Sequence, residues 1–155
     1  MPTRLEALPH RHVLTLPSEP SAVRLARETA ERALVEWGIG LGHPTVGPAL
    51  LILSELVTNS VRHAAALSPQ LTVIYAAGAD CLALAVHDRH PHRPLLYGAV
   101  TGVGAGGLAT VMELVLGLGG TAVVRADADG KGKSIWITLP LTEPEERHTQ
   151  GSSRS

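Results

Sequence analysis

The chain has 155 residues, of which 45% are hydrophobic and 17% charged, and its formal net charge is −1. This length suits one domain with a single core, and the near-zero charge gives no overall attraction for nucleic acid. The single cysteine, Cys81, excludes a disulfide within the chain, and no apolar run reaches the length of a membrane span, so we expect a cytoplasmic protein without direct membrane or nucleic-acid binding.

The first part of the chain predicts a strand followed by two helices. Residues 1–10 predict a flexible N-terminus, and residues 13–17 form a short apolar strand that ends at a proline. Apolar residues at helical spacing predict a helix over residues 18–37. A second helix is expected over residues 45–67, and its middle is apolar on nearly all sides, so this helix should be well buried.

The remainder predicts two hairpins separated by a long loop and a helix. The expected strands are residues 71–76, 81–87, 121–126 and 134–139, and the expected helix is residues 108–118. Residues 88–107 form a loop rich in Pro, Gly and His, and loops of that length inside a domain are usually functional. The polar residues 143–155 predict a disordered tail, which leaves a folded domain over 11–142.

The order of these elements predicts the fold class. Hairpins that follow each other in sequence, with the helices grouped between them, indicate an α+β protein. We expect a two-layer α/β sandwich in which helices cover one mixed, mostly antiparallel sheet.

Polar residues recur along one side of the second predicted helix. Glu55 and Asn59 are four residues apart and therefore stack on one face, and Arg62 and His63 follow two turns after Glu55 along the same side. A carboxylate that can take a proton, beside an amide oxygen that can bind a hard cation, suits phosphate chemistry. The alternative is an ordinary polar stripe, because Glu and Asn at this spacing are common.

Two further features lie downstream. Asp88 ends a predicted buried strand, where its carboxylate could accept a hydrogen bond from a ligand or simply cap a turn. The glycine run of residues 102–107 leads directly into a helix at Leu108. Glycines let backbone N–H groups approach an anion, and a helix N-terminus attracts one, although a glycine run can also be just a flexible loop.

The segment from Glu55 to Ser60 resembles the N-box of the GHKL, or Bergerat-fold, ATPases, the superfamily of histidine kinases, gyrase, Hsp90 and MutL. It is most similar to the stand-alone anti-sigma-factor serine/threonine kinases, and the resemblance runs from about residue 10 to 141. It implies that Glu55 is the general base and that Asn59 coordinates Mg²⁺ on the phosphates of ATP. Arg62 and His63 would help to hold phosphate.

The same resemblance implies roles for the downstream residues. Asp88 would accept a hydrogen bond from the adenine amino group. Gly104, Gly106, Gly107 and Leu108 would belong to the phosphate-binding lid, with the register of its glycines left open by Ala105. Ser134 stands where the family has Thr in its last strand, and its hydroxyl would lie near Asp88.

The chain departs from the family pattern immediately after Asp88. The usual Asp-x-Gly-x-Gly is here Asp88-Arg89-His90-Pro91-His92, without either glycine, which alters the wall of the adenine pocket. The histidines of this segment and His87 could bind a metal by residue type, but their spacing matches no zinc signature and favours a solvated loop.

The resemblance therefore implies an ATP- and Mg²⁺-dependent kinase that phosphorylates Ser or Thr of an antagonist protein, sequesters a sigma factor, or does both. Arg24, on the charged face of the first helix, falls where these kinases touch protein partners, and homodimers are common among them. A nucleotide-dependent protein-binding module with little or no kinase activity is the alternative, and a scaffold that binds no nucleotide is the third possibility.

Overall fold

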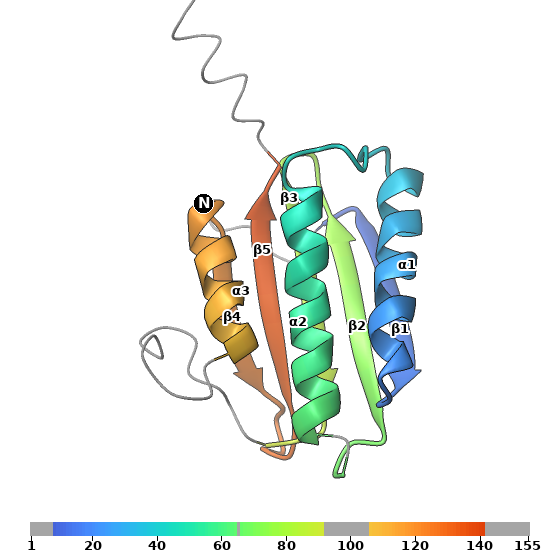
Figure 1. Ribbon diagram of the computed structural model, residues 1–155, viewed down its shortest axis with the longest axis vertical. Coiled ribbons are helices and arrows are strands. Elements are labelled where there is room, and N and C mark those ends of the chain that lie inside the picture. Colours follow the sequence, from blue (N-terminus) through green and yellow to red (C-terminus); the bar gives the residue numbers. More distant parts are fainter. Residues whose placement is uncertain (1–7, 65, 92–105, 142–155) are drawn as a thin grey trace, which may run out of the picture.

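The structure, a computed structural model, describes residues 8–64, 66–91 and 106–141. Its elements are β1 (His10–Pro17), α1 (Ser21–Glu36), α2 (Val46–Ala64), β2 (Gln70–Ala77), β3 (Cys81–Asp88), α3 (Gly106–Gly117), β4 (Thr121–Ala126) and β5 (Lys133–Pro140). Within these residues the strands form one sheet in the order β1-β2-β3-β5-β4, and the three helices lie side by side over one face (Figure 1). The expected α+β two-layer sandwich is confirmed.

The sheet differs from the expectation in one respect, because all pairings between the described strands are antiparallel. We expected a mixed sheet. After β3 the chain passes through α3 to the edge strand β4 and leaves the position next to β3 empty. The following strand, β5, then fills this position between β3 and β4. β3 and β4 run in the same direction but never pair with each other.

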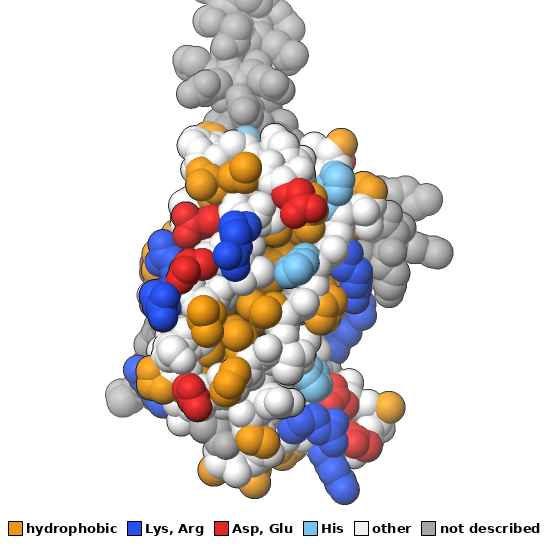
Figure 2. Space-filling model, turned by 90° about the vertical axis from the view of Figure 1, so that its right-hand side faces the viewer, with side chains coloured by type: hydrophobic (Ala, Val, Ile, Leu, Met, Phe, Trp, Pro, Cys, Tyr) orange, Lys and Arg blue, Asp and Glu red, His pale blue; other side chains and the backbone are white. Residues whose placement is uncertain are grey.

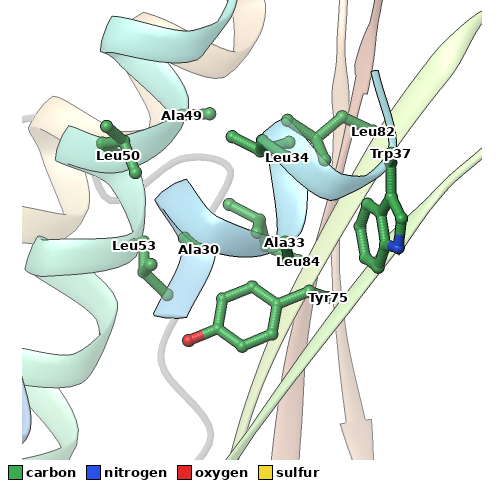
Figure 3. Close-up of a pocket in the computed structure, with 10 residues that line it drawn as sticks. All are labelled: Ala30, Ala33, Leu34, Trp37, Ala49, Leu50, Leu53, Tyr75, Leu82 and Leu84. Atoms are coloured by element: carbon green, nitrogen blue, oxygen red, sulfur yellow. The ribbon is translucent and has the colours of Figure 1, made fainter. Parts of the chain in front are cut away.

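The core lies between the sheet and the helices and is built from Leu, Ile, Val and Ala. The buried face of α1 is mostly alanine, which lets this helix approach the sheet closely. The Tyr75 hydroxyl of β2 donates a 2.7 Å hydrogen bond to the carbonyl oxygen of Ala26 in α1, and burial raises the pKa of Tyr75. A small apolar cavity of about 10 Å³ remains between α1, α2 and the sheet, beside Tyr75 and Trp37 (Figure 3).

The other face of the sheet is covered by none of the described helices. The strand registers place five residues in one row across it: Val13, Ile74, Ala85, Trp136 and Val123. Val13 and Val123, on the two edge strands, are about half exposed. Cys81 lies on this face as a buried residue, as its apolar neighbours predicted.

Several element boundaries differ from the sequence predictions. β1 starts at His10 instead of residue 13, because its histidines pack on aromatic rings: His10 stacks on Trp37 and His12 contacts Tyr75. α3 starts inside the glycine run, at Gly106. The predictions for the first seven residues and for the tail after residue 142 lie outside the described residues. In the described ranges, no helix combines the length and the apolar character that crossing a membrane requires.

Four segments far apart in the sequence meet at one end of the molecule (Figure 1). They are the last turns of α2, the end of β3, the first turn of α3 and the start of β5. This end is where the fold gathers most of the candidate functional residues.

Candidate functional site

The α2 helix presents Glu55 and Asn59 on its flank toward α3. Ser54 marks the opposite flank, because its hydroxyl accepts a hydrogen bond from Arg27 of α1. A helix turns about 100° per residue, so Asn59 lies on the flank opposite to Ser54. Glu55 lies beside Asn59 and slightly farther from the buried face of the helix. α2 lies between α1 and α3 in Figure 1, so these two side chains line the α2–α3 side.

Both side chains are half-buried, and neither has a hydrogen-bond partner among residues 8–64, 66–91 and 106–141. A half-buried amide and a half-buried carboxylate without protein partners have their oxygen atoms available for a ligand. Oxygen donors of this kind suit Mg²⁺, which prefers carboxylate and amide oxygens together with phosphate. The donor set therefore fits a magnesium–nucleotide complex.

Arg62 and His63 lie in the last turn of α2 and are exposed. Their position is at the end of the molecule where the nucleotide residues are expected. Basic side chains in a last turn also stabilise the helix through its dipole, so their position alone has a purely structural explanation.

Asp88 is a buried carboxylate, only 3% exposed, and the structure surrounds it with donors. The Ser60 hydroxyl donates to Oδ2 at 2.7 Å, and the Lys133 ammonium donates to Oδ1 at 2.7 Å. The backbone N–H of His90 donates to Oδ1 at 3.1 Å. The carboxylate is thus fixed by α2, by β5 and by the segment that follows β3.

Lys133, rather than Ser134, occupies the position beside Asp88. The register pairs Asp88 with Lys133 and His87 with Ser134. Paired residues share a face of the sheet and successive residues alternate, so Ser134 lies on the face away from the helices. The prediction that the Ser134 hydroxyl lies near Asp88 is therefore wrong, and the preceding residue, Lys133, lies there instead.

Sequence analysis missed Lys133 and Ser60 as partners of Asp88. A signal for Ser60 was present, since a serine directly after Asn59 falls on the buried side of an otherwise apolar helix. Lys133 gave no such signal, because a lysine next to a hairpin turn is normally a solvated residue.

The turn between β4 and β5 is anchored to the end of β3 by charged side chains. Arg89 contacts Asp127 at 2.6 Å and Asp129 at 2.7 Å, and His87 contacts Asp127 at 2.9 Å. Hydrogen bonds from Arg89 and from the backbone N–H of Lys131 lower the pKa of Asp129 to about 2. Burial acts to raise the pKa of Asp127, but hydrogen bonds from His87 and Arg89 outweigh it and lower that pKa.

Gly132 is required by this arrangement. A Cβ atom at this position would lie within 2.7 Å of the carbonyl oxygen of Asp88 and closer still to the Asp127 carboxylate. The turn therefore sits directly against the Asp88 backbone. It fixes the end of β3 from the side opposite to the helices.

The glycine run is described only in part. Gly106 and Gly107 are the first two residues of α3, whereas Gly104 lies outside the described residues. The first N–H groups of a helix have no partner within it and can bind an anion. Leu108 packs against the core and anchors this end of the helix.

Arg24 lies far from these residues along the chain, on the exposed face of α1. Its side chain is 73% exposed and forms a 3.0 Å ion pair with Glu28 one turn later. Figure 2 shows the side of the molecule that carries α1, where basic and acidic side chains are interspersed with hydrophobic ones.

Comparison with known proteins assigns the chain to a family. The family described as histidine kinase-, DNA gyrase B-, and HSP90-like ATPase matches residues 47–143, which is more than half of the chain. The chain belongs to this ATPase family. The match includes α2 with Glu55 and Asn59, the end of β3 with Asp88, and β5, and it supports ATP binding by the chain. No curated protein matches the chain.

Solved structures of other proteins share the fold of this chain. A histidine kinase domain from the blue-light activated histidine kinase of Erythrobacter litoralis EL346 is 21% identical with a TM-score of 0.52, covering 81% of this chain and 62% of that one. The RsbU and RsbW domains of Rv1364c from Mycobacterium tuberculosis match at 23% identity and a TM-score of 0.58, covering 84% and 32%.

A third structure, the histidine kinase AdeS of Acinetobacter baumannii, is 15% identical with a TM-score of 0.51, covering 85% of this chain and 68% of that one. The chain thus spans less than two thirds of the Erythrobacter and Mycobacterium chains. At these identities the likeness shows a common fold, and it does not assign the activities of the three proteins to this chain.

Proposed function

We propose that the chain binds Mg-ATP between α2 and α3 and transfers the γ-phosphate to a serine or threonine of an antagonist protein. The observation that carries this proposal is the half-buried pair Glu55 and Asn59 on the α3 side of α2, without partners among the described residues. The resemblance of the α2 segment to anti-sigma-factor kinases supports it, and so does the shared fold of a structure that includes an RsbW domain.

Three groups of the site would have separate tasks in this reaction. Magnesium, when bound, neutralises charge on the phosphates, and the Asn59 amide oxygen would hold it. Glu55 would take the proton of the attacking hydroxyl, whose oxygen bonds to the γ-phosphorus while the bond to the β-phosphate oxygen breaks and ADP leaves. The first N–H groups of α3, at Gly106 and Gly107, would bind phosphate oxygens.

Glu55→Gln tests the catalytic step. The substitution keeps the size and hydrogen bonding of the side chain but removes the base. We expect ATP affinity to stay within about twofold and phosphoryl transfer to fall by about two to four orders of magnitude. The measurements are calorimetry for ATP and transfer of labelled γ-phosphate to the cognate antagonist. Transfer at the parent rate by Glu55→Gln would rule out Glu55 as the base.

A second candidate function is a nucleotide-dependent protein-binding module without transfer, which could sequester a sigma factor. The residues after Asp88 favour it, because His90 stands at the first glycine position of the Asp-x-Gly-x-Gly pattern that the resemblance implies. On this alternative the parent binds ATP and its protein partner but labels no antagonist.

The partner surface is proposed to be the exposed face of α1 around Arg24. Leu25 and Val35 are exposed on the same helix, so apolar and charged groups are combined there as at many protein interfaces. Arg24→Glu should weaken the partner at least about tenfold and leave ATP binding unchanged, because the substitution reverses an exposed charge. Arg125→Glu, an exposed charge reversal on the edge strand β4 away from α1, is the matched control. Equal effects of both variants would remove the specific role of Arg24.

A further inference from the structure

The buried pair of Asp88 and Lys133 has hydrogen-bonding capacity that the protein does not use. An ionised carboxylate offers about four acceptor positions. Three of those on Asp88 are taken, two on Oδ1 by Lys133 and the His90 N–H, and one on Oδ2 by Ser60. One acceptor position remains, on Oδ2.

Lys133 has the complementary surplus. Its ammonium group has three N–H donors. One points to Asp88 Oδ1 at 2.7 Å, and a second lies 3.5 Å from the carbonyl oxygen of His90. The third has no acceptor among the residues that the structure describes. A buried ammonium with an unpaired N–H lowers the stability of the fold, and an acceptor atom from a ligand would satisfy this donor.

The pair therefore keeps one donor and one acceptor that no described residue uses. The outer edge of adenine has the matching pattern, with an N6–H donor beside the N1 acceptor. The corresponding edge of guanine has one acceptor, O6, and two donors, N1–H and N2–H. A single free acceptor position would leave one of the guanine donors unpaired, which is unfavourable in a buried site.

We propose that Lys133 is a specificity-determining residue that donates a hydrogen bond to N1 of adenine, while Asp88 Oδ2 accepts from the N6 amino group. This proposal rests on the proposed ATP-binding function and deepens it. It gives the lysine a task that Ser134, on the other face of the strand, does not perform.

ATP analogues test the proposal on the unmodified protein. In 1-deaza-ATP the N1 atom is replaced by C–H, and in 7-deaza-ATP the same change is made at N7, which the pair does not contact. We expect the protein to bind 1-deaza-ATP about ten- to a hundredfold more weakly than ATP, as for loss of a hydrogen bond to a charged donor, and 7-deaza-ATP within about threefold. GTP should also bind at least about tenfold more weakly than ATP.

Variants then assign the effect to the lysine. Lys133→Met should bind ATP and 1-deaza-ATP with equal affinity, because the N1 donor is absent. The double variant Asp88→Asn/Lys133→Met removes both buried charges and gives the same readout if the single variant does not fold. Ser134→Ala is the matched control and should keep the full preference for ATP.

The outcomes separate this inference from the function on which it rests. Absence of ATP binding by the parent would overturn both. ATP binding with an equal affinity for 1-deaza-ATP would overturn the role of Lys133 and leave the proposed function standing. A preference for ATP that persists unchanged in both Lys133 variants would likewise show that another group reads N1.

Discussion

Asn59 is the residue whose role can be tested most simply. Its amide is half-buried and has no partner among the described residues, so removing it should cost the fold little. We expect Asn59→Ala to weaken ATP binding at least about tenfold in the presence of Mg²⁺ and much less in its absence, because the substitution removes a metal ligand. Calorimetry with and without magnesium measures both affinities. Thr58→Ala, the neighbouring position, should behave like the parent, and a similar loss in both variants would contradict this assignment.

The ion pair between Asp88 and Lys133 makes a separate prediction for stability. Their side chains are 3% and 7% exposed, and their charged atoms are 2.7 Å apart. Lys133→Met leaves a buried carboxylate without its counter-charge and should lower the free energy of unfolding by about 3–5 kcal/mol. The double variant Asp88→Asn/Lys133→Met should recover most of that loss. Urea unfolding measures both, and a single variant as stable as the parent would show that solvent reaches the pair.

At the scale of single residues, sequence reasoning could predict the site where the chain is helical. Glu55 and Asn59 stack because helical periodicity fixes their relation, whatever the rest of the chain does. It could not choose between Lys133 and Ser134, because successive strand residues face opposite sides and the face depends on the register of a long-range pairing. The Arg89 contacts with Asp127 and Asp129 depend on the conformation of a turn, which the composition of that turn does not determine.

At the scale of elements, ion pairs hold the β4–β5 turn against the end of β3, and their contribution to stability should depend on pH. In the folded protein the pKa of Asp129 is about 2, below the value of about 3.9 of a free aspartate, and the pKa of Asp127 is also lowered. A pKa that is lower in the folded state stabilises the protein at pH values above the unfolded value. This stabilisation is lost as the pH falls from about 4 toward 2.

Arg89→Ala tests the contribution of these ion pairs. The substitution removes the guanidinium group that lowers both pKa values, so the melting temperature should fall at neutral pH. The difference from the parent should shrink between about pH 4 and pH 2, where the carboxylates of the parent become protonated. Thermal unfolding followed by circular dichroism across this range measures it. A difference that is constant down to pH 2 would mean that Arg89 acts through packing alone.

The elements themselves could be predicted because each carries its own periodicity. The α2 helix is apolar around most of its surface, and β3 is small and apolar from Cys81 to Val86. The fully antiparallel sheet could not be predicted in detail, because the placement of β5 between β3 and β4 is a property of the chain path and not of any one segment. The start of α3 inside a glycine run was missed because glycine is a weak helix former.

At the scale of the whole molecule, the fold brings the end of α2, the end of β3 and the starts of α3 and β5 to one end (Figure 1). Residues from 55 to 133 in the sequence thereby meet around one region, while Arg24 lies on α1, which α2 separates from α3. This separation is why nucleotide binding and partner binding should respond to different substitutions. It also leaves the apolar row on the other face of the sheet outside both proposed surfaces.

The central claim is that this chain binds Mg-ATP at the α2–α3 side, and a calorimetric titration of the purified chain with Mg-ATP tests it most directly. We predict saturable binding with a micromolar Kd, roughly −7 to −8 kcal/mol, and a matching rise in the melting temperature. Parallel titration of Asn59→Ala should give markedly weaker binding. No heat and no thermal shift at millimolar Mg-ATP would contradict the claim and identify the chain as a member of the ATPase family that binds no nucleotide.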